Sequence, residues 1–395
     1  GTMAPQIQGM KRRKSMGLRL GCLGLLLLPV PFALLVVGLE SLGLFASVPA
    51  HFVVAVILAA ITTLPYTAIV LWFDRNEKEP FWLVLLAFLW GALVATSYSG
   101  LFNSGFQSLS LELVGHPQIA AQLTASFSAP FIEELTKGMA LLGLLVIFRE
   151  EVDNILDGII YGALVGLGFA WFENITYYLK PYLTEPQPAG LGDMLQLWWI
   201  RGVVNGVTTH AMFTGLTGLG IGLIRAKRKG FARWLFLPLF LGLAMGCHFA
   251  WNTFAGLFFA TAESEAVQLL VSLPLAVLVL QVPFLLLLLM VVLLVWGHEN
   301  RMIHDSLADE DSSIASEAEI KNLVPARTRN WLLLKHLFRF GPRAWWRRRR
   351  VETHLIALAF TKWHHREDQL PWTADQDAEV LRLRAKIRAL RRPLR

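Results

Sequence analysis

The chain has 395 residues, of which 55% are hydrophobic and 16% are charged, and its formal net charge at pH 7 is +7. The apolar residues come in runs of about 20, the length of helix that crosses the hydrocarbon core of a bilayer, and this excludes an ordinary water-soluble globular protein. The two cysteines, Cys22 and Cys247, lie inside such runs and imply no disulfide framework. We therefore predict an all-α, polytopic membrane protein.

The N-terminal residues precede the predicted bundle. Residues 1–3, Gly-Thr-Met, look like a scar left by tag removal and carry no fold information. Residues 4–16 are basic and predict a cytoplasmic N-terminal segment. The rival interpretation is that the first apolar run is a cleaved signal peptide, because its basic flank fits one, but its removal would not change the orientation of the rest.

The predicted membrane bundle occupies residues 17–298 and contains about eight transmembrane helices. The connection 102–125 has room for a short amphipathic piece. Gly158, Gly162 and Gly166 recur four residues apart in the fifth helix, a spacing that lets two helices approach closely. The expected helices are approximately 17–38, 51–73, 80–101, 126–148, 155–178, 199–224, 231–258 and 266–296.

Lysine and arginine in the short connections predict the orientation, because cytoplasmic loops carry an excess of both. With a cytoplasmic N-terminus, the inner connections hold Arg75, Lys78, Arg149 and the cluster at 225–233, whereas the outer ones hold only Lys180. We therefore expect a multi-pass protein of the cell membrane with both termini in the cytoplasm.

The character of the chain changes after Arg301. Residues 299–325 are acidic and rich in serine and predict a linker, and residues 326–395 predict a basic cytoplasmic tail. The run "RNWLLLKHLFRFGPRAWWRRRR" predicts an amphipathic helix that lies on anionic lipid, so lipid rather than nucleic acid is the expected partner of the tail. The final "EVLRLRAKIRALRRPLR" fits either a second short helix or a disordered tail. The apolar positions at helical spacing in the first run are Trp331, Leu334, Leu337 and Phe338.

Four predicted helices carry ionisable or amide side chains inside the membrane, where such groups are costly and mark functional sites. A rise of 1.5 Å per residue places Glu133, Glu173, His210, His248 and Asn252 roughly 8–17 Å below the outer surface. The helices therefore bring polar groups to one layer in the outer half of the membrane. The whole set is Glu133, Glu134 and Lys137, then Glu173 and Asn174, then Arg201, Asn205 and His210, and finally His248 and Asn252.

Spacing within the helices suggests which groups meet. Glu133 and Lys137 are four residues apart and share a helix face, which predicts an ion pair and leaves Glu134 over. His248 and Asn252 are also four apart and can point into one cavity.

Arg201 and His210 are nine residues apart, which places them near opposite faces of a regular helix. Either that helix is distorted or Arg201 has a structural role.

Carboxylates beside imidazoles support two routes to amide hydrolysis. A glutamate can act as general base on a water while histidine and asparagine steady the oxyanion. Alternatively, two histidines and a glutamate can hold a catalytic zinc ion with another glutamate as the base. The sequence has no HExxH and no Gly-x-Ser-x-Gly motif. The rival classes are an ion- or proton-coupled transporter, which would need polar groups in the inner half as well, and a non-catalytic scaffold.

Four motifs occur in the order found in PrsW-type intramembrane proteases, and the chain resembles that family over residues 50–260. "FIEELTKG" resembles the family's Glu-Glu-x-x-Lys motif, and "FAWFENITYY", with Phe169 and Glu173, is similar to its Phe-x-x-x-Glu-Asn motif. "RGVVNGVTTHAMFTGLTGLG" resembles its arginine and histidine helix, and "HFAWN" its closing His-x-x-x-Asn. "WFDRNEKEPFWL" also looks like the Asp and Glu-Pro signature before the third helix.

The resemblance implies a member of the superfamily that contains the CAAX and Abi proteases, with a membrane-anchored, anti-sigma-factor-like protein as substrate. Carried over residue by residue, Glu133 would be the base with Glu134 close behind, His248 and Asn252 would polarise the scissile carbonyl, and Glu173 and His210 would complete the site. No cofactor is fixed, but if the enzyme uses Zn²⁺, the expected ligands are Glu173, His210 and His248. The expected supporting residues are Lys137, Phe169, Asn174 and Arg201.

Overall fold

The computed structural model describes residues 21–149, 151–184, 190–226, 230–259, 264–367 and 377–391, and the regular elements in these ranges are all helical. The predicted scar at 1–3 and the basic segment 4–16 lie outside the described residues. Within the described ranges, seven helices are long and apolar enough to cross a membrane, which confirms an all-α polytopic fold. These are Gly21–Ser47, Pro49–Phe73, Phe81–Val114, Ile155–Leu183, Leu191–Ala226, Phe231–Phe258 and Val282–Leu307.

Five of the expected helices differ clearly from the structure. The first continues to Ser47, and the sixth begins at Leu191. The third does not end near residue 101 but continues to Val114. The fourth is α7 (Ala129–Ile147), which is long enough but carries three charged side chains and so is not among the seven. The eighth is broken at Gln281 into α13 (Leu273–Leu280) and α14 (Val282–Leu307).

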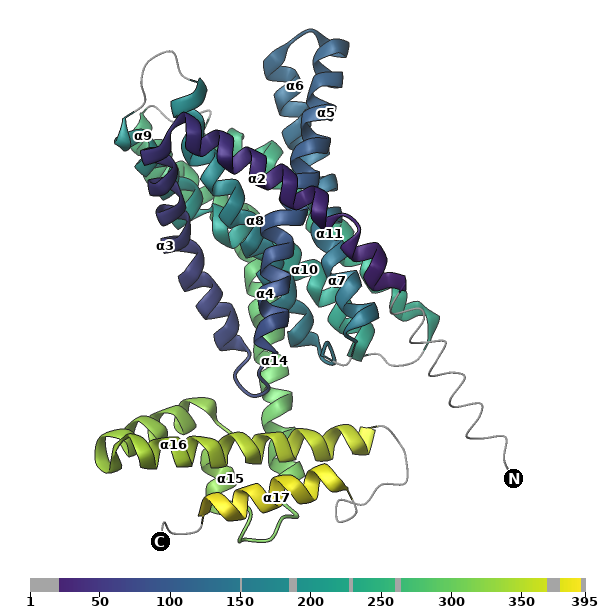
Figure 1. Cartoon of the computed structure of the whole chain (residues 1–395), viewed down its shortest axis with the longest axis vertical. Coiled ribbons are helices and arrows are strands. Elements are labelled where there is room, and N and C mark those ends of the chain that lie inside the picture. Colours follow the sequence, from purple (N-terminus) through teal and green to yellow (C-terminus); the bar gives the residue numbers. More distant parts are fainter. Residues whose placement is uncertain are drawn as a thin grey trace. The chain divides into compact units, whose positions relative to one another are not determined.

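The chain forms two compact units, of which the first comprises the residues up to Asp74 together with Glu79–Met290. Its centre is the packed pair α8 (Ile155–Thr184) and α10 (Gly206–Ala226), whose membrane-spanning stretches are almost wholly buried (Figure 1). By contrast, α2 (Val30–Ser47) and α3 (Pro49–Phe73) leave many large apolar side chains exposed, as suits contact with lipid.

Glycine allows the central helices to approach so closely. A Cβ atom added at Gly158 would lie 2.2 Å from the carbonyl oxygen of Gly218, and one at Gly166 would lie 2.1 Å from that of His210. Gly162 faces Thr214 in the same way, at 2.4 Å. The predicted close packing along this glycine series is confirmed. Its last member, Gly166, packs directly against the backbone of His210, a candidate site residue.

The third helix combines α4 (Phe81–Leu89), a π-helical segment at Trp90–Ala95, and α5 (Thr96–Val114). Gly115 then adopts φ +68°, and the chain returns as α6 (Pro117–Leu123) beside α5 to form a helical hairpin (Figure 1). A further π-helical segment, Thr124–Ser128, leads from α6 directly into α7.

The other inter-helix segments of the first unit are also partly π-helical. α9 (Leu191–Leu197) passes through the π-helical segment Trp198–Val204 into α10, and a short 3₁₀ segment, Phe231–Leu235, precedes α11 (Phe236–Phe259). The one-turn helix α12 (Glu265–Val267) and the π-helical segment Gln268–Ser272 precede α13.

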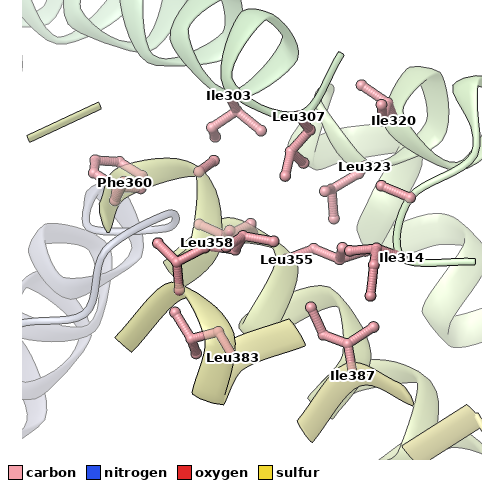
Figure 2. Packing of buried hydrophobic residues seen from close by; sticks show 14 of the residues in the cluster. Ile303, Leu307, Ile314, Ile320, Leu323, Leu355, Leu358, Phe360, Leu383 and Ile387 are labelled. Carbon is pink, nitrogen blue, oxygen red and sulfur yellow. The ribbon is translucent and has the colours of Figure 1, made fainter. Parts of the chain in front are cut away.

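The second unit comprises residues 75–78 and 291–395 and has its own apolar core (Figure 2). The stretch 299–325, for which composition predicted a linker, supplies part of this core and includes the helix α15 (Glu317–Leu323). The final segment forms α17 (Ala378–Arg391) rather than an unstructured tail over its described residues. The buried members include Ile303, Leu307, Ile314, Ile320, Leu323, Leu355, Leu358, Phe360, Leu383 and Ile387.

The basic helix of this unit is α16 (Ala326–Glu367), which is interrupted at Gly341, where φ is +80°. Before the break, Trp331, Leu334 and Phe338 are 64%, 43% and 82% exposed and lie on one helix face. Residues 326–350 contain nine lysines and arginines and no aspartate or glutamate. This part of α16 is therefore amphipathic, as the sequence predicts.

Candidate active site

Lys137 lies at the centre of the polar layer, and its side chain is completely buried. Its Nζ atom lies 2.8 Å from Oε1 of Glu134 and 3.5 Å from Oε2 of Glu133. The predicted pair with Glu133 is confirmed, and Glu134, which the sequence left over, is a second and closer partner of Lys137. The ring of Phe169 packs against the ammonium group, with its centroid 3.9 Å from Nζ.

His210 joins α10 to both neighbouring helices. Its Nδ1 atom is 3.0 Å from Nζ of Lys137, and its Nε2 atom is 2.9 Å from Oε2 of Glu173. A protonated lysine has only donors, so Nδ1 is the acceptor and Nε2 carries the proton that is donated to Glu173. This contact network fixes one tautomer of the neutral ring.

Arg201 reaches the same carboxylate although it lies nine residues before His210. Its Nη2 atom donates to Oε2 of Glu173 at 2.8 Å, its Nε atom donates to Oδ1 of Asn174 at 3.2 Å, and its guanidinium stacks 3.6 Å from the ring of Tyr177. The helix between Arg201 and His210 is distorted, because the π-helical segment ends at Asn205 with φ −128°. Of the two explanations left open by the spacing, the distorted helix is the one observed.

His248 closes the layer from α11. Its Nδ1 atom lies 3.1 Å from Oε1 of Glu134, and its Nε2 atom lies 4.0 Å from Oε2 of Glu133. The ring stacks on Phe213 with a centroid distance of 4.7 Å. When Nδ1 of the neutral ring donates to Glu134, Nε2 is left as an acceptor directed toward Glu133.

Asn252, one turn further along α11, donates from Nδ2 to the carbonyl oxygen of Ala125 at 2.7 Å. This bond ties α11 to the π-helical segment before α7. Asn252 also lines the cavity described below, so the structure brings all six predicted catalytic residues into one region.

A cavity of about 610 Å³ opens onto this layer and is lined by residues from α5 to α11. Glu133, Glu173, His210, His248 and Asn252 contribute to its wall, and so does Arg201. Glu134 and Lys137 lie behind the wall and are fully buried. The carboxylates that line the cavity, Glu133 and Glu173, are therefore placed to meet a substrate, whereas Lys137 and Glu134 support them from behind.

Asn103 is a residue of the candidate site that the sequence analysis did not identify. Its Nδ2 atom donates to Oε1 of Glu133 at 3.3 Å, and its Oδ1 atom accepts a bond from the hydroxyl of Ser128 at 2.7 Å. Asn103 was assigned to a connection because the third apolar run weakens after residue 101. Only the continuation of the helix to Val114 places it above the glutamates.

The layer also contains donors that fit a divalent metal ion. Glu133, Glu173 and His210 each offer one ligand atom, and these atoms lie within 4.8 Å of one another. This set shares Glu173 and His210 with the predicted zinc ligands and has Glu133 in place of His248. Oε2 of Glu133 is buried and accepts no hydrogen bond from the described residues, which leaves it available to a ligand.

The Asp and Glu-Pro signature forms a separate cluster at the start of α4. Oδ2 of Asp74 accepts the backbone N–H of Glu79 at 2.7 Å, and the hydroxyl of Tyr161 donates to Glu79. Burial, together with the neighbouring Asp157 carboxyl group, raises the pKa of Glu79 from 4.5 to about 10. None of these residues lines the cavity, which indicates a structural role.

We expect Glu79→Gln to remove a pH dependence of stability. Between pH 5 and 9, Glu79 is protonated in the folded protein and ionised in the unfolded chain, so the wild-type free energy of unfolding should fall by up to about 1 kcal/mol per pH unit. The amide keeps a donor and an acceptor but does not titrate. Thermal unfolding in detergent at pH 5, 7 and 9 checks this, and parallel curves for the two proteins would contradict it.

Comparison with known proteins places the chain in a family. Residues 79–294, more than half of the chain, match the profile of a family described as PrsW family intramembrane metalloprotease. Protease PrsW of Geobacillus kaustophilus is 30% identical over 173 residues, which is 42% of this chain and 67% of the relative. The Protease PrsW proteins of Bacillus subtilis and Oceanobacillus iheyensis are 30% identical over 168 residues and 27% identical over 174 residues, covering 67% and 68% of the relatives and 42% and 41% of this chain.

No solved structure matches the chain. The matched segment includes every residue of the polar layer, from Glu133 to Asn252. The chain is thus a membrane-embedded peptidase and belongs to the PrsW family of intramembrane proteases.

Proposed function

We propose that this peptidase cuts a membrane-anchored protein at the polar layer and that Glu133 takes the proton from the attacking water. The carrying observation is Oε2 of Glu133, a buried acceptor without a hydrogen bond from the described residues, in the wall of the cavity. It faces Nε2 of His248 at 4.0 Å. A water between Oε2 of Glu133 and Nε2 of His248 would donate one hydrogen bond to each and turn a lone pair toward the substrate carbonyl.

The remaining residues hold this arrangement. Glu134 orients His248 through its bond to Nδ1, and Lys137 neutralises Glu134 and directs His210. The sequence suggested that His248 polarises the carbonyl, but a neutral His248 bound in this way has no proton left to donate. Asn252 keeps a second N–H of its amide group, so we assign the donor to the developing oxyanion to Asn252.

A metal-dependent form is the second candidate, because the Glu133, Glu173 and His210 donors are grouped as a zinc site requires and the matching family is described as metalloproteases. A bound Zn²⁺ ion supplies Lewis-acid polarisation of the carbonyl and a more acidic water. His210 would contribute Nε2, and its ring proton would then lie on Nδ1, so this form requires a neutral Lys137 that accepts a hydrogen bond from Nδ1.

The test compares purified wild type with Glu133→Gln on a panel of single-span membrane proteins in detergent. The glutamine form should show no cleavage, because the amide cannot accept the proton from water. Both proteins are assayed with a chelator and again after zinc is added. Cleavage that survives the chelator supports the metal-free route, whereas loss and recovery with zinc supports the metal-dependent one. Equal cleavage by both proteins would remove Glu133 from the mechanism.

The proposed substrate has its scissile bond near the outer face of the membrane, as an anti-sigma-factor-like protein would. This rests on the orientation proposed from the basic connections, with both termini in the cytoplasm and the layer in the outer half of the bilayer. A transporter is less well supported. On this orientation, the residues that line the cavity all lie in the polar layer or closer to the outer face, and none continues the path into the inner half of the membrane.

We further propose that α16 binds anionic lipid at the inner leaflet. The exposed Trp331, Leu334 and Phe338 provide the apolar face, and nine basic residues between 326 and 350 complement negatively charged headgroups.

Two single-cysteine variants, Phe338→Cys and Ser312→Cys, test both statements on a background with Cys22 and Cys247 replaced by alanine. On intact cells, an impermeant maleimide should label neither site until the membrane is opened, which reports a cytoplasmic location. In nanodiscs, a spin label at 338 should contact lipid when the bilayer contains phosphatidylglycerol, and the exposed control at 312 should not. Equal water exposure of the label at 338 in anionic and zwitterionic discs would refute lipid binding.

A further inference from the structure

The two sides of the cavity differ in chemistry. The charged groups, Glu133, Glu173, Lys180 and Arg201, come from α7, α8 and the segment before α10. The α5–α6 hairpin contributes only uncharged residues to the lining, most of them carboxamides. We call Asn103, Gln107, Gln118 and Gln122 the carboxamide wall.

The wall is regularly spaced. Asn103 and Gln107 are four residues apart on α5, and Gln118 and Gln122 are four apart on α6, so the members of each pair lie on one helix face about 6 Å apart. In an extended chain, the backbone groups on one edge recur every second residue, about 6.7 Å apart. The interval within each pair is therefore close to the interval along the edge of a β-strand.

The wall is chemically matched to a peptide backbone. Each carboxamide has both a donor and an acceptor, as each peptide group has. A helical segment satisfies its own backbone, but an unwound segment at membrane depth must find partners for every N–H and C=O group. Neutral amides supply such partners without placing additional charge in the bilayer.

The wall also begins at the proposed catalytic base. Asn103 donates to Oε1 of Glu133 at 3.3 Å, and Gln122 donates to the hydroxyl of Ser126 at 2.8 Å and to the carbonyl oxygen of Asn252 at 3.3 Å. The side chains of Gln107 and Gln118 are exposed and are the wall members that we expect to pair with a substrate. We propose that the α5–α6 hairpin holds the substrate as an extended segment, through its backbone rather than its side chains, with the scissile bond near Glu133. This inference rests on the proposed function and specifies the form in which the substrate binds.

The test measures binding in nanodiscs to the Glu133→Gln protein, so that it does not depend on turnover. The probe is a fluorescein-labelled synthetic peptide with a 20-residue Leu/Ala span and a ten-residue Gly/Ser/Ala flank, and a second version has four backbone esters in the flank in place of amides. If the wall pairs with the backbone, the amide peptide should bind about tenfold more tightly than the ester peptide. In the background that also carries Gln107→Leu and Gln118→Leu, this ratio should fall below about twofold.

Gln268→Leu in the Glu133→Gln background is the matched control, because Gln268 does not line the cavity and should leave the tenfold ratio unchanged. Both altered glutamines of the wall are exposed, so folding is not at risk, and melting curves check this. Equal binding of the two peptides, a ratio that persists without the wall, or no binding of either peptide would overturn the inference. Such a result would not affect the cleavage test of Glu133. Conversely, if the Glu133→Gln protein cleaved as well as wild type, the proposed role of Glu133 would be wrong, but the ratio of amide to ester peptide binding could still be measured.

Discussion

Lys137→Met is expected to lower the free energy of unfolding by about 3–5 kcal/mol and to reduce cleavage by about 10²–10³-fold. Lys137 is completely buried and has Glu134, Glu133 and His210 within 3.5 Å of its ammonium group. Without it, two adjacent buried carboxylates lose their shared cation, and His210 loses the donor that fixes its tautomer. Thermal unfolding in detergent and the cleavage assay measure the two effects.

The double variant Lys137→Met/Glu134→Gln separates them. It removes one buried negative charge with the positive one, and the amide oxygen can still accept from His248, so most of the stability should return. Activity should not return, because His210 is still without its donor. A single Lys137→Met variant that unfolds at the wild-type temperature would show that the ion pairs are not the source of stability assigned to them.

Gly166→Val is expected to destabilise the protein by about 3 kcal/mol and to reduce cleavage at least about 100-fold. Its Cβ atom would lie 2.1 Å from the carbonyl oxygen of His210, and a backbone group cannot turn aside as a side chain can. α10 must therefore move away from α8, which lengthens the bond between His210 and Glu173. Thermal unfolding and cleavage are measured as before.

Gly242→Ala provides the matched control, since a Cβ at this helical glycine meets nothing within 4 Å. It should be neutral or stabilising by up to about 1 kcal/mol, because alanine is the better helix former. If Gly166→Val retained full activity, the close approach of α8 and α10 would not determine the position of His210.

The general plan of the bundle could be predicted because lipid demands long apolar helices. The break at Gln281 and the extension beyond residue 101 could not, because both depend on tertiary contacts rather than on hydropathy. The hydroxyl of Thr209, for example, lies within hydrogen-bond distance of the side chains of both Asn205 and Gln281, so a polar network between helices accompanies the break. Apolar content alone does not record such bonds.

The residues of the candidate site could largely be predicted, because burying an ionisable group in a membrane is costly and each such group in a predicted helix therefore marks a possible functional position. The partners of these groups were harder to predict. Arg201 reaches Glu173 only through a π-helical distortion. Lys137 pairs with Glu134 as well as with the predicted Glu133, because spacings of three and four residues both permit a pair. In the second unit, the acidic composition of 299–325 concealed the apolar residues that pack into its core.

The polar layer has an uneven count of charges, and this has a consequence for the reaction. Among the groups that pair directly in the layer, three carboxylates (Glu133, Glu134 and Glu173) face two cations (Lys137 and Arg201), so with both histidines neutral and Lys180 of the cavity wall left aside, one negative charge is in excess. In the proposed reaction Glu133 takes a proton from water, and that excess would pass to the attacking oxygen and then to the tetrahedral oxyanion. By this route the reaction would move an existing charge by a few ångströms instead of creating a new one in a medium where isolated ions are costly. A membrane enzyme built in this way meets the electrostatic cost of its transition state when it folds, before any substrate arrives.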